Sequence, residues 1–186
     1  MKAKNNYILL ECKINMTTTK SNTWENYPEL VHFYTTHRCA PKDLYPSERR
    51  FLPWLADNVA SVLDVGCAAG GFENIWKYYN SKIDYTGVDL SSILIEAAKE
   101  LHPNSKFIRA DPVAGIPLID SGYDLVQALG WLFWEPKYKK ALSELWRLTN
   151  RWLFLDIRLV DSPANAQTGE QRMEFGVDWD GETTTP

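Results

Sequence analysis

The sequence predicts an α/β fold in which a doubly wound, mostly parallel sheet carries helices on both faces. From Ser61 onward, short apolar segments alternate with segments whose apolar residues recur every three to four positions. The first pattern is typical of buried strands and the second of amphipathic helices. Their regular alternation indicates parallel βαβ units with right-handed crossovers. Short helices are expected ahead of this sheet.

The first two units begin with Ser61–Val65 (SVLDV), an apolar run followed by glycine, which predicts a buried strand. Gly71–Tyr79 places its large apolar residues on one face and is expected to be a helix. Residues 82–88 return to strand character. The apolar residues of 93–101 repeat at helical period, and the two serines before this segment offer an N-cap.

The second half of the sheet follows the same logic. Residues 106–109 and 123–128 are predicted strands, and the link between them contains two prolines and a glycine, so we expect a loop or a single turn there. Pro136 suits the first position of a helix that runs to about Thr149. Residues 151–160 (RWLFLDIRLV) are apolar enough to predict a fifth strand that is buried on both faces.

The chain is expected to hold one domain. Residues 24–160 form the predicted domain, residues 1–23 a loose extension, and residues 161–186 a polar tail. Two helices within 28–58, the second kinked or split at Pro53, are placed as lids over the site. A chain of 186 residues with 45% hydrophobic residues is long enough to bury a sizeable core.

Charge and cysteine usage exclude several classes of function. The net charge is −4 and no dense cluster of Lys and Arg is present, so nucleic acid is not the expected partner. No apolar stretch approaches the roughly 18 residues of a membrane span. The three cysteines lack the CxxC spacing, which predicts reduced thiols in a cytoplasmic protein and no metal site.

The strongest local signal is the segment VLDVGCAAGG, residues 62–71. A buried strand leads into a bend of glycines and small residues, and this bend opens a helix. Such a bend lets a ligand approach the backbone closely and directs helix N–H groups at a carboxylate or a phosphate. By itself this pattern indicates only a generic nucleotide-binding loop.

Three acids add specificity, because Asp64, Asp89 and Asp111 each end or follow one of three successive predicted strands. The carboxyl ends of parallel strands meet at one crevice. An acid at position 89 can accept hydrogen bonds from ribose hydroxyls, and an acid at position 111 can accept a hydrogen bond from the exocyclic amine of adenine. Purely structural roles stay open for all three: a loop cap, a helix cap and a turn acid, respectively.

A dinucleotide site is the alternative for the same loop. The NAD fingerprint requires glycine at position 68 in its GxGxxG spacing, but Ala68 occupies that position. A methyl group there obstructs a pyrophosphate. S-adenosyl-L-methionine contains no phosphate, so the methyl donor is favoured over NAD and an oxidoreductase is the weaker interpretation.

With these motifs, the sequence resembles the class I S-adenosylmethionine-dependent methyltransferases. The resemblance covers about residues 61–160 and rests on VLDVGCAAGG, YTGVDLS (85–91), FIRADP (107–112) and YDLVQALG (123–130). It implies a Rossmann-like fold, with S-adenosyl-L-methionine as cofactor. The family's sheet ends with a sixth and a seventh strand, and no segment after Val160 predicts them. Either the tail folds differently or the chain is shortened.

The resemblance also implies the residues of the donor site. Gly66, Ala68 and Gly70 would line the methionine part, and Asp64 would anchor the loop and approach the donor's amino group. The complete implied set is Asp64, Gly66, Cys67, Ala68, Gly70, Asp89, Leu90, Asp111, Pro112 and Gln127. Within it, Asp89 would hold the ribose, Asp111 and Pro112 the adenine, and Gln127 the sulfonium side. For Cys67, we expect a packing role rather than a nucleophilic one.

The expected reaction is in-line displacement of the donor's methyl group onto a small-molecule acceptor. No catalytic residue is assigned. An oxygen acceptor would need a base, for which the candidates are His37, Glu135 and Tyr138. Trp131, Phe133 and Trp134 are either core or pocket wall. For Tyr34, Arg38 and Tyr45, lid packing is favoured over contact with the donor.

A non-catalytic module is the alternative function. Such a module would bind the cofactor, or bind a partner through the uncovered edge of the fifth strand. Edge pairing between copies is compatible with this sequence, which leaves the oligomeric state open.

Overall fold

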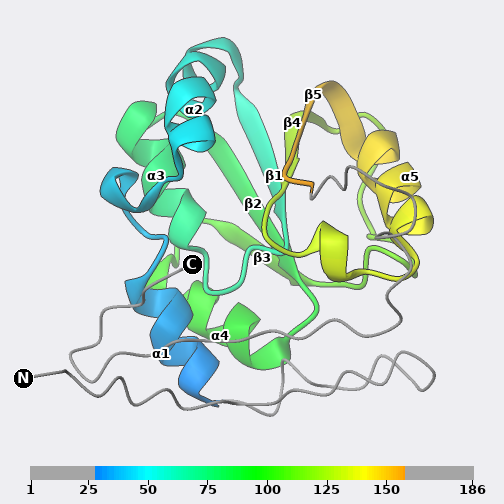
Figure 1. The fold of residues 1–186 in the computed structure, drawn as a ribbon, viewed down its shortest axis with the longest axis horizontal. Helices are drawn as coiled ribbons and strands as arrows, with labels where there is room; N and C mark the ends of the chain where they lie inside the picture. The colour runs from blue at the N-terminus through cyan, green and yellow to red at the C-terminus, as the bar shows by residue number, and fades with distance from the viewer. Residues whose placement is uncertain (1–27, 158–186) are drawn as a thin grey trace, which may run out of the picture. The chain divides into compact units, whose positions relative to one another are not determined.

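The computed structural model describes residues 28–157, which form a five-stranded sheet with helices on both faces (Figure 1). The strand order is β3-β2-β1-β4-β5, and every neighbouring pair is parallel. The strands are β1 (Ser61–Val65), β2 (Asp84–Asp89), β3 (Lys106–Arg109), β4 (Tyr123–Ala128) and β5 (Thr149–Leu155). The order reverses between β1 and β4, and the predicted α/β class is confirmed.

Four helices lie on one face of the sheet and one on the other, which makes the sheet doubly wound (Figure 1). The first group is α1 (Pro28–Thr36), α2 (Pro46–Asn58), α3 (Gly71–Tyr79) and α4 (Ser92–Leu101). The opposite face carries α5 (Tyr138–Leu148). Short 3-10 turns, η2 (Pro41–Asp43) and η3 (Leu132–Trp134), precede α2 and α5. The predicted loop between β3 and β4 is confirmed.

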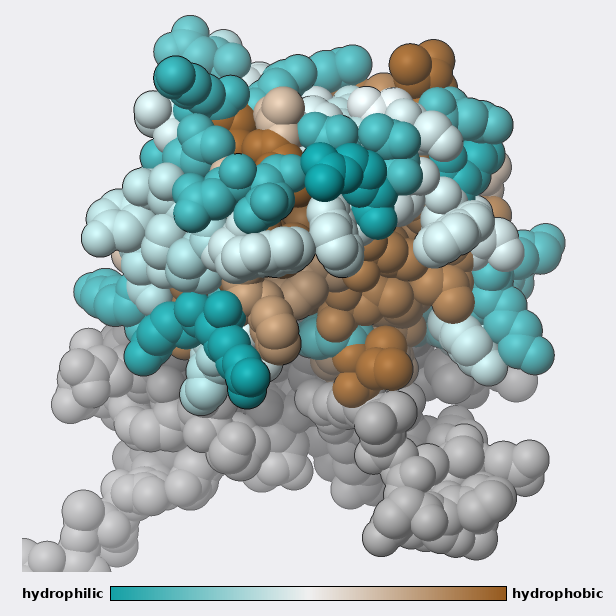
Figure 2. Space-filling model, turned by 90° about the horizontal axis from the view of Figure 1, so that it is seen from above, coloured by the Kyte–Doolittle hydropathy of each residue, from teal (hydrophilic) through white to brown (hydrophobic). Residues whose placement is uncertain are grey.

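Two hydrophobic clusters, one on each face, hold the layers together. Because side chains alternate along a strand, β1 supplies both clusters. Val62 packs toward α2 and α3, whereas Leu63 and Val65 pack toward α5. The core therefore consists of two layers divided by the sheet. On one side of the molecule, apolar residues also reach the surface between polar ones (Figure 2).

Three sequence-based expectations about the elements were wrong in detail. Pro53 lies inside α2 without splitting it, because α2 is continuous from Pro46 to Asn58. The helix expected from Pro136 begins at Tyr138, since the turn at 132–134 takes up the preceding residues.

The fifth strand also differs from the expectation. It begins at Thr149, and its early residues Asn150, Arg151 and Trp152 are exposed rather than buried. Within residues 28–157, β5 is an edge of the sheet, so no strand covers its outer side there. The predicted extension 1–23 and tail 161–186 lie outside the described residues, and the domain bounds stay a prediction.

Candidate functional site

The bend after β1 is tied to the end of β2 by backbone hydrogen bonds. The amides of Gly66 and Cys67 both donate to the Val88 carbonyl, at 2.7 and 3.0 Å. Gly66 has a φ of 84° and Gly70 a φ of 81°, in the left-handed region that glycine adopts without strain. Ala68 also has a positive φ, 47°, where an alanine is strained. The residues of the bend are fixed before any ligand binds.

Asp89 at the end of β2 organises the bend. Its two carboxylate oxygens accept the amides of Ala68 and Ser91, each at 2.9 Å. Burial raises the pKa of Asp89, and these amide hydrogen bonds oppose the rise. A carboxylate offers about four lone-pair sites, so two amides leave acceptor capacity for hydroxyl groups. Asp89 therefore joins two loops and can still accept further hydrogen bonds.

Asp64 lies below the bend in a buried polar network. The Tyr85 hydroxyl donates to its carboxylate at 2.5 Å. Burial raises the pKa of Asp64 to about 6, while Tyr85 and Gln127 favour the ionised form. The Gln127 Nε2 has no hydrogen-bond partner among the described residues. We therefore attribute the lowering of the Asp64 pKa by Gln127 to the dipole of this nearby amide group. Asp64 is only 3% exposed, which places the carboxylate among protein atoms.

Gln127 is fully buried in β4, beside Asp64 in the sheet register. Its Oε1 accepts the indole N–H of Trp76 in α3 at 2.9 Å. Cys67 is likewise buried, and burial raises the pKa of its thiol well above the usual value. These side chains support the floor of the crevice, and their contact with a donor stays a prediction.

Asp111 follows β3 and closes a turn. Its carboxylate accepts the Val113 amide at 2.8 Å, and its carbonyl accepts the amides of Ala114 and Gly115. Leu90 at the end of β2 is half-buried, and its carbonyl accepts the Arg109 guanidinium at 3.1 Å. The turn of Asp111 thus follows β3 at the carboxyl edge, where Asp89 ends β2.

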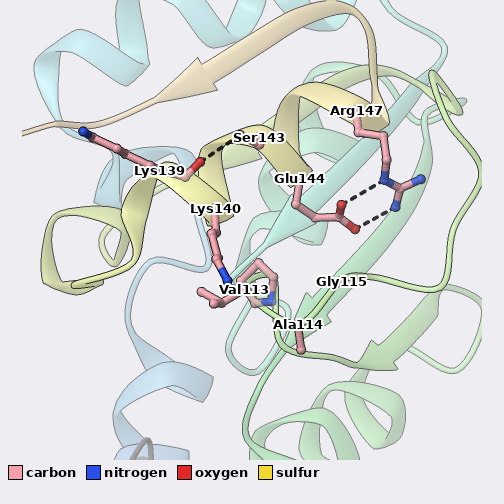
Figure 3. A pocket seen from close by; sticks show the side chains of 9 residues that line it. Val113, Ala114, Gly115, Lys139, Lys140, Ser143, Glu144 and Arg147 are labelled. Atoms are coloured by element: carbon pink, nitrogen blue, oxygen red, sulfur yellow. Dashed lines mark hydrogen bonds and ion pairs between the residues drawn. The ribbon is translucent and has the colours of Figure 1, made fainter.

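A hollow of about 490 Å³ begins at Pro112 and continues between residues 112–115 and α5 (Figure 3). Glu144 and Arg147 pair along α5 at 2.7 Å, and Lys140 extends toward Val113. A second hollow of about 150 Å³ is lined by residues of the bend, Ala69 and Gly71, together with Tyr34 of α1. Neither hollow includes Asp64, Gly66 or Asp89 in its lining.

Two residues reach the bend from distant parts of the chain. The indole N–H of Trp131, after β4, donates to the Val65 carbonyl at 2.5 Å. Its ring covers Gly66 so closely that a Cβ at Gly66 would overlap it. From the α1–α2 connection, Arg38 pairs with the buried Glu48 and lies 5.0 Å from the centre of the Phe72 ring. The sequence named both residues only as possible walls or lids, because neither contact has a local signal.

Two of the candidate bases, His37 and Glu135, form hydrogen bonds with residues close to them in the sequence. The Nδ1 of His37 lies 3.1 Å from the Phe33 carbonyl and 2.9 Å from the Thr36 hydroxyl. Glu135 accepts the Lys137 amide, and Tyr138 is exposed. Between residues 28 and 157 no three His, Cys, Asp or Glu side chains are grouped to hold a metal. No described helix is both long and apolar enough to cross a membrane.

The acids therefore follow the sheet order along one edge. Asp111 follows β3, Asp89 ends β2 and Asp64 lies in β1, and the neighbouring β4 leads into Trp131. The edge is the carboxyl one, and the strand order reverses between β1 and β4, where the crevice predicted from the sequence would open. Open α/β sheets bind their ligands at this kind of switch point.

Comparison with known proteins agrees with this geometry. Residues 62–151 match the model of a methyltransferase domain. The chain is 32% identical over 88 residues to a malonyl-[acyl-carrier protein] O-methyltransferase of Pectobacterium atrosepticum, a match that covers 47% of this chain and 34% of that protein. A trans-aconitate 2-methyltransferase of Enterobacter sp. is 29% identical over 123 residues, 64% of this chain and 48% of that protein.

The matched residues thus span about a third to a half of the length of these curated relatives. Among solved structures, a methyltransferase of Thermotoga maritima described as a possible histamine N-methyltransferase superposes with a TM-score of 0.51 at 21% identity, covering 68% of this chain and 56% of that one. This likeness shows the fold. The family match shows that residues 62–151, which include the glycine bend at the switch point, belong to a methyltransferase domain family.

Proposed function

We infer that this protein binds S-adenosyl-L-methionine at the carboxyl edge of β1–β3 and transfers its methyl group to an oxygen of a small acid. One observation carries the inference: Asp89 accepts hydrogen bonds from the Ala68 amide of the glycine bend and the Ser91 amide after β2, and it keeps lone pairs for the ribose hydroxyls. The family match supports methyl transfer as the reaction. The names of two relatives, a malonyl-[acyl-carrier protein] O-methyltransferase and a trans-aconitate 2-methyltransferase, support an acid as the acceptor.

The residues present fit this cofactor better than a dinucleotide. The Ala68 methyl lies in the bend where a pyrophosphate would need glycine, but a sulfonium nucleoside brings no phosphate to that place. The acids of the rim suit a donor that carries a positive charge on sulfur. Asp89 would hold the ribose, and the turn of Asp111 and Pro112 would flank the adenine.

A bound donor would supply an activated methyl carbon: the acceptor lone pair would form a bond to this carbon while its bond to sulfur breaks, and the neutral thioether would leave with the electron pair. The contribution of the chain is then alignment and exclusion of water. The bend and Asp89 would hold the nucleoside, and the buried hydrogen bonds of Tyr85 with Asp64 and of Trp76 with Gln127 support the ends of the strands beside the bend.

An ionised acceptor agrees best with the described side chains. His37 and Glu135 take part in local hydrogen bonds, His37 with Phe33 and Thr36 and Glu135 with the Lys137 amide. An alcohol would need such a base, whereas a carboxylate is already ionised at neutral pH, since its ordinary pKa is about 4. The acceptors in the names of the relatives, a malonyl group and trans-aconitate, are both acids. We therefore propose a carboxylate oxygen as the nucleophile.

Transfer of a labelled methyl group tests this proposal on a panel of small acids, including malonyl thioesters and trans-aconitate, with their amides and alcohols as matched controls. We expect a base-labile methyl ester from at least one acid and no product from its amide. Rates should stay flat from about pH 6 to 8, because the acceptor is ionised throughout. Transfer only to amines or alcohols would contradict the carboxylate assignment. Donor binding without any transfer would favour a non-catalytic module.

A further inference from the structure

Trp131 connects the two banks of the crevice. The first of these two banks is the segment at the end of β1, which includes Val65 and Gly66. The second is the connection that follows β4 and includes Gly130. The Trp131 indole crosses between them, because its N–H donates to the Val65 carbonyl and its ring covers Gly66. The side chain is only half-buried, so part of its surface remains accessible. A ligand that enters between these banks must contact this ring.

The anchoring of the connection limits how far this ring can shift. Gly130 has a φ of 82°, and its amide donates to the Asp156 carboxylate after β5 at 2.8 Å. Leu132 directly after Trp131 is buried in the cluster under α5. Trp131 therefore has one fixed neighbour on each side and a hydrogen bond of its own. A ring held in this way is preorganised for binding, because little rotamer freedom is lost when a ligand arrives.

The order of the strands decides which part of the donor this ring would meet. Asp111 follows β3, Asp89 ends β2, Gly66 follows β1 and Trp131 follows β4. Along this edge the partners for adenine and ribose therefore come first, and Trp131 comes next. The donor has the same linear order, namely base, ribose and then the sulfonium centre attached to the ribose.

We propose that Trp131 is the specificity-determining residue for the donor's charge, and that its indole contacts the sulfonium and distinguishes the methylated donor from the neutral thioether product. This proposal rests on the proposed function, because it requires the nucleoside to lie over Asp89 and Asp111. Tryptophan is the aromatic side chain that attracts a ligand cation most strongly, and the attraction grows when water is excluded. Release of the uncharged product would follow from losing this attraction once the methyl group has left.

Calorimetric titration of the full chain with S-adenosylmethionine and, separately, with S-adenosylhomocysteine tests the proposal without any turnover. We expect Trp131→Ala to weaken binding of the charged donor about 5- to 30-fold, which is roughly 1–2 kcal/mol converted at 1.4 kcal/mol per tenfold. Binding of the neutral product should change less than about 3-fold, because the attraction to a cation is absent there. Retained product binding in the variant also shows that the site is folded.

A matched pair of variants separates charge recognition from simple packing and avoids the gap that alanine leaves over Gly66. Trp131→Phe keeps an aromatic face and should retain most of the preference for the charged donor, whereas Trp131→Leu keeps apolar volume and should lose it. Equal losses for both ligands, tighter binding of both, or full preference in the leucine variant would overturn the proposal. If the unaltered chain binds neither ligand, the proposed function fails, and that outcome is distinct from an unchanged preference in the variants.

Discussion

The two halves of the crevice are built in different ways. In the half formed by β1, β2 and the bend between residues 66 and 70, the hydrogen bonds that join the bend and Asp64 to β2 are made by residues that the sequence motifs contain. In the half formed by the connections after β4 and β5, the contacts come from far along the chain: Trp131 reaches Val65, and Gly130 reaches Asp156. The first half therefore has a strong local signature, and the second depends on packing that no motif specifies.

The two halves also differ in how deeply their strand residues are buried. The strand residues Val62, Leu63, Asp64 and Val65 are all buried, whereas Asn150, Arg151 and Trp152 of β5 are exposed. A substitution in the first half is expected to disturb packing on every side. An equivalent one in the second half has room to relax.

The largest difference is expected between two glycines that share a backbone conformation. Gly66 in the first half and Gly130 in the second have φ values of 84° and 82°. A Cβ at Gly66 would overlap the Trp131 ring, whereas nothing lies within 4 Å of a Cβ at Gly130. Gly130→Ala should cost only the left-handed strain, about 1–2 kcal/mol. Gly66→Ala adds overpacking and should cost about 2–5 kcal/mol in total.

Urea unfolding of both variants measures this difference directly. Equal losses of unfolding free energy in the two variants would show that the Trp131 ring moves aside without cost. Gly66 and Gly130 would then not differ in how they tolerate a side chain.

The second prediction concerns the pH dependence of the buried network. The pKa of Asp64 is raised to about 6, so the folded chain binds a proton more readily than the unfolded chain does. The buried charge therefore opposes folding above pH 6, and this cost disappears as the pH falls below the ordinary value near 4. Relative to Asp64→Asn, the unaltered chain should lose about 2 kcal/mol of unfolding free energy between pH 4 and 6.

Asn can still accept the hydrogen bond from the Tyr85 hydroxyl, so this variant removes the charge and keeps the contact. Parallel stability curves for the two proteins across pH 4–7 would contradict the assigned burial of Asp64.

A smaller loss is expected in the exposed half. The rings of Trp54 and Trp152 form an edge-to-face pair with centroids 5.3 Å apart, and the two side chains are 51% and 39% exposed. Trp152→Ala should lower the unfolding free energy by about 0.5–1.5 kcal/mol, the usual range for such a pair. Trp146→Ala is the control, because Trp146 is 70% exposed and should tolerate the change. If Trp152→Ala lost more unfolding free energy than Gly66→Ala, the expected difference between the two halves would be contradicted.

The smallest effect is expected at the strained alanine of the bend. Ala68 has a φ of 47°, and glycine would remove a strain of about 1–2 kcal/mol while adding about 0.5–1 kcal/mol of unfolded-state entropy. Ala68→Gly should therefore raise the unfolding free energy by roughly 0.5–1 kcal/mol. The amide hydrogen bond to Asp89 is unaffected by this change. A lower melting temperature would show that the Ala68 methyl contributes packing that outweighs its strain.

The sequence predicted the elements of the first half closely because their signals are local. The strand 61–65 and the helix 71–79 agree with the structure residue for residue. Ser91 is the N-cap of α4, with its hydroxyl accepting the Leu94 amide. Periodicity and capping act over a few neighbouring residues, so they can be recognised without knowledge of the tertiary structure.

Where the sequence failed, distant residues decide the outcome. The predicted burial of β5 on both faces was wrong because composition does not reveal whether a neighbouring strand is present. The position of Trp131 depends on a carbonyl 66 residues earlier in the chain. The Arg38–Glu48 pair joins a connection to the helix that follows it, and such pairs have no pattern in the sequence. The positions of Asp89 and Asp111 at the carboxyl ends of β2 and β3 could be predicted from the sequence, whereas the contacts of Trp131 and Arg38 could not.

The central claim is that β1, β2 and β3 hold the nucleoside of the methyl donor, with Asp89 as its principal hydrogen-bond acceptor. Calorimetric titration of S-adenosylmethionine into the full chain and into Asp89→Ala tests it most directly. The account predicts one site per chain and a loss of about 1–3 kcal/mol of binding free energy in the variant, as expected for a lost pair of hydrogen bonds to a charged group. Equal affinity for the two proteins, or no binding to the unaltered chain, would contradict it.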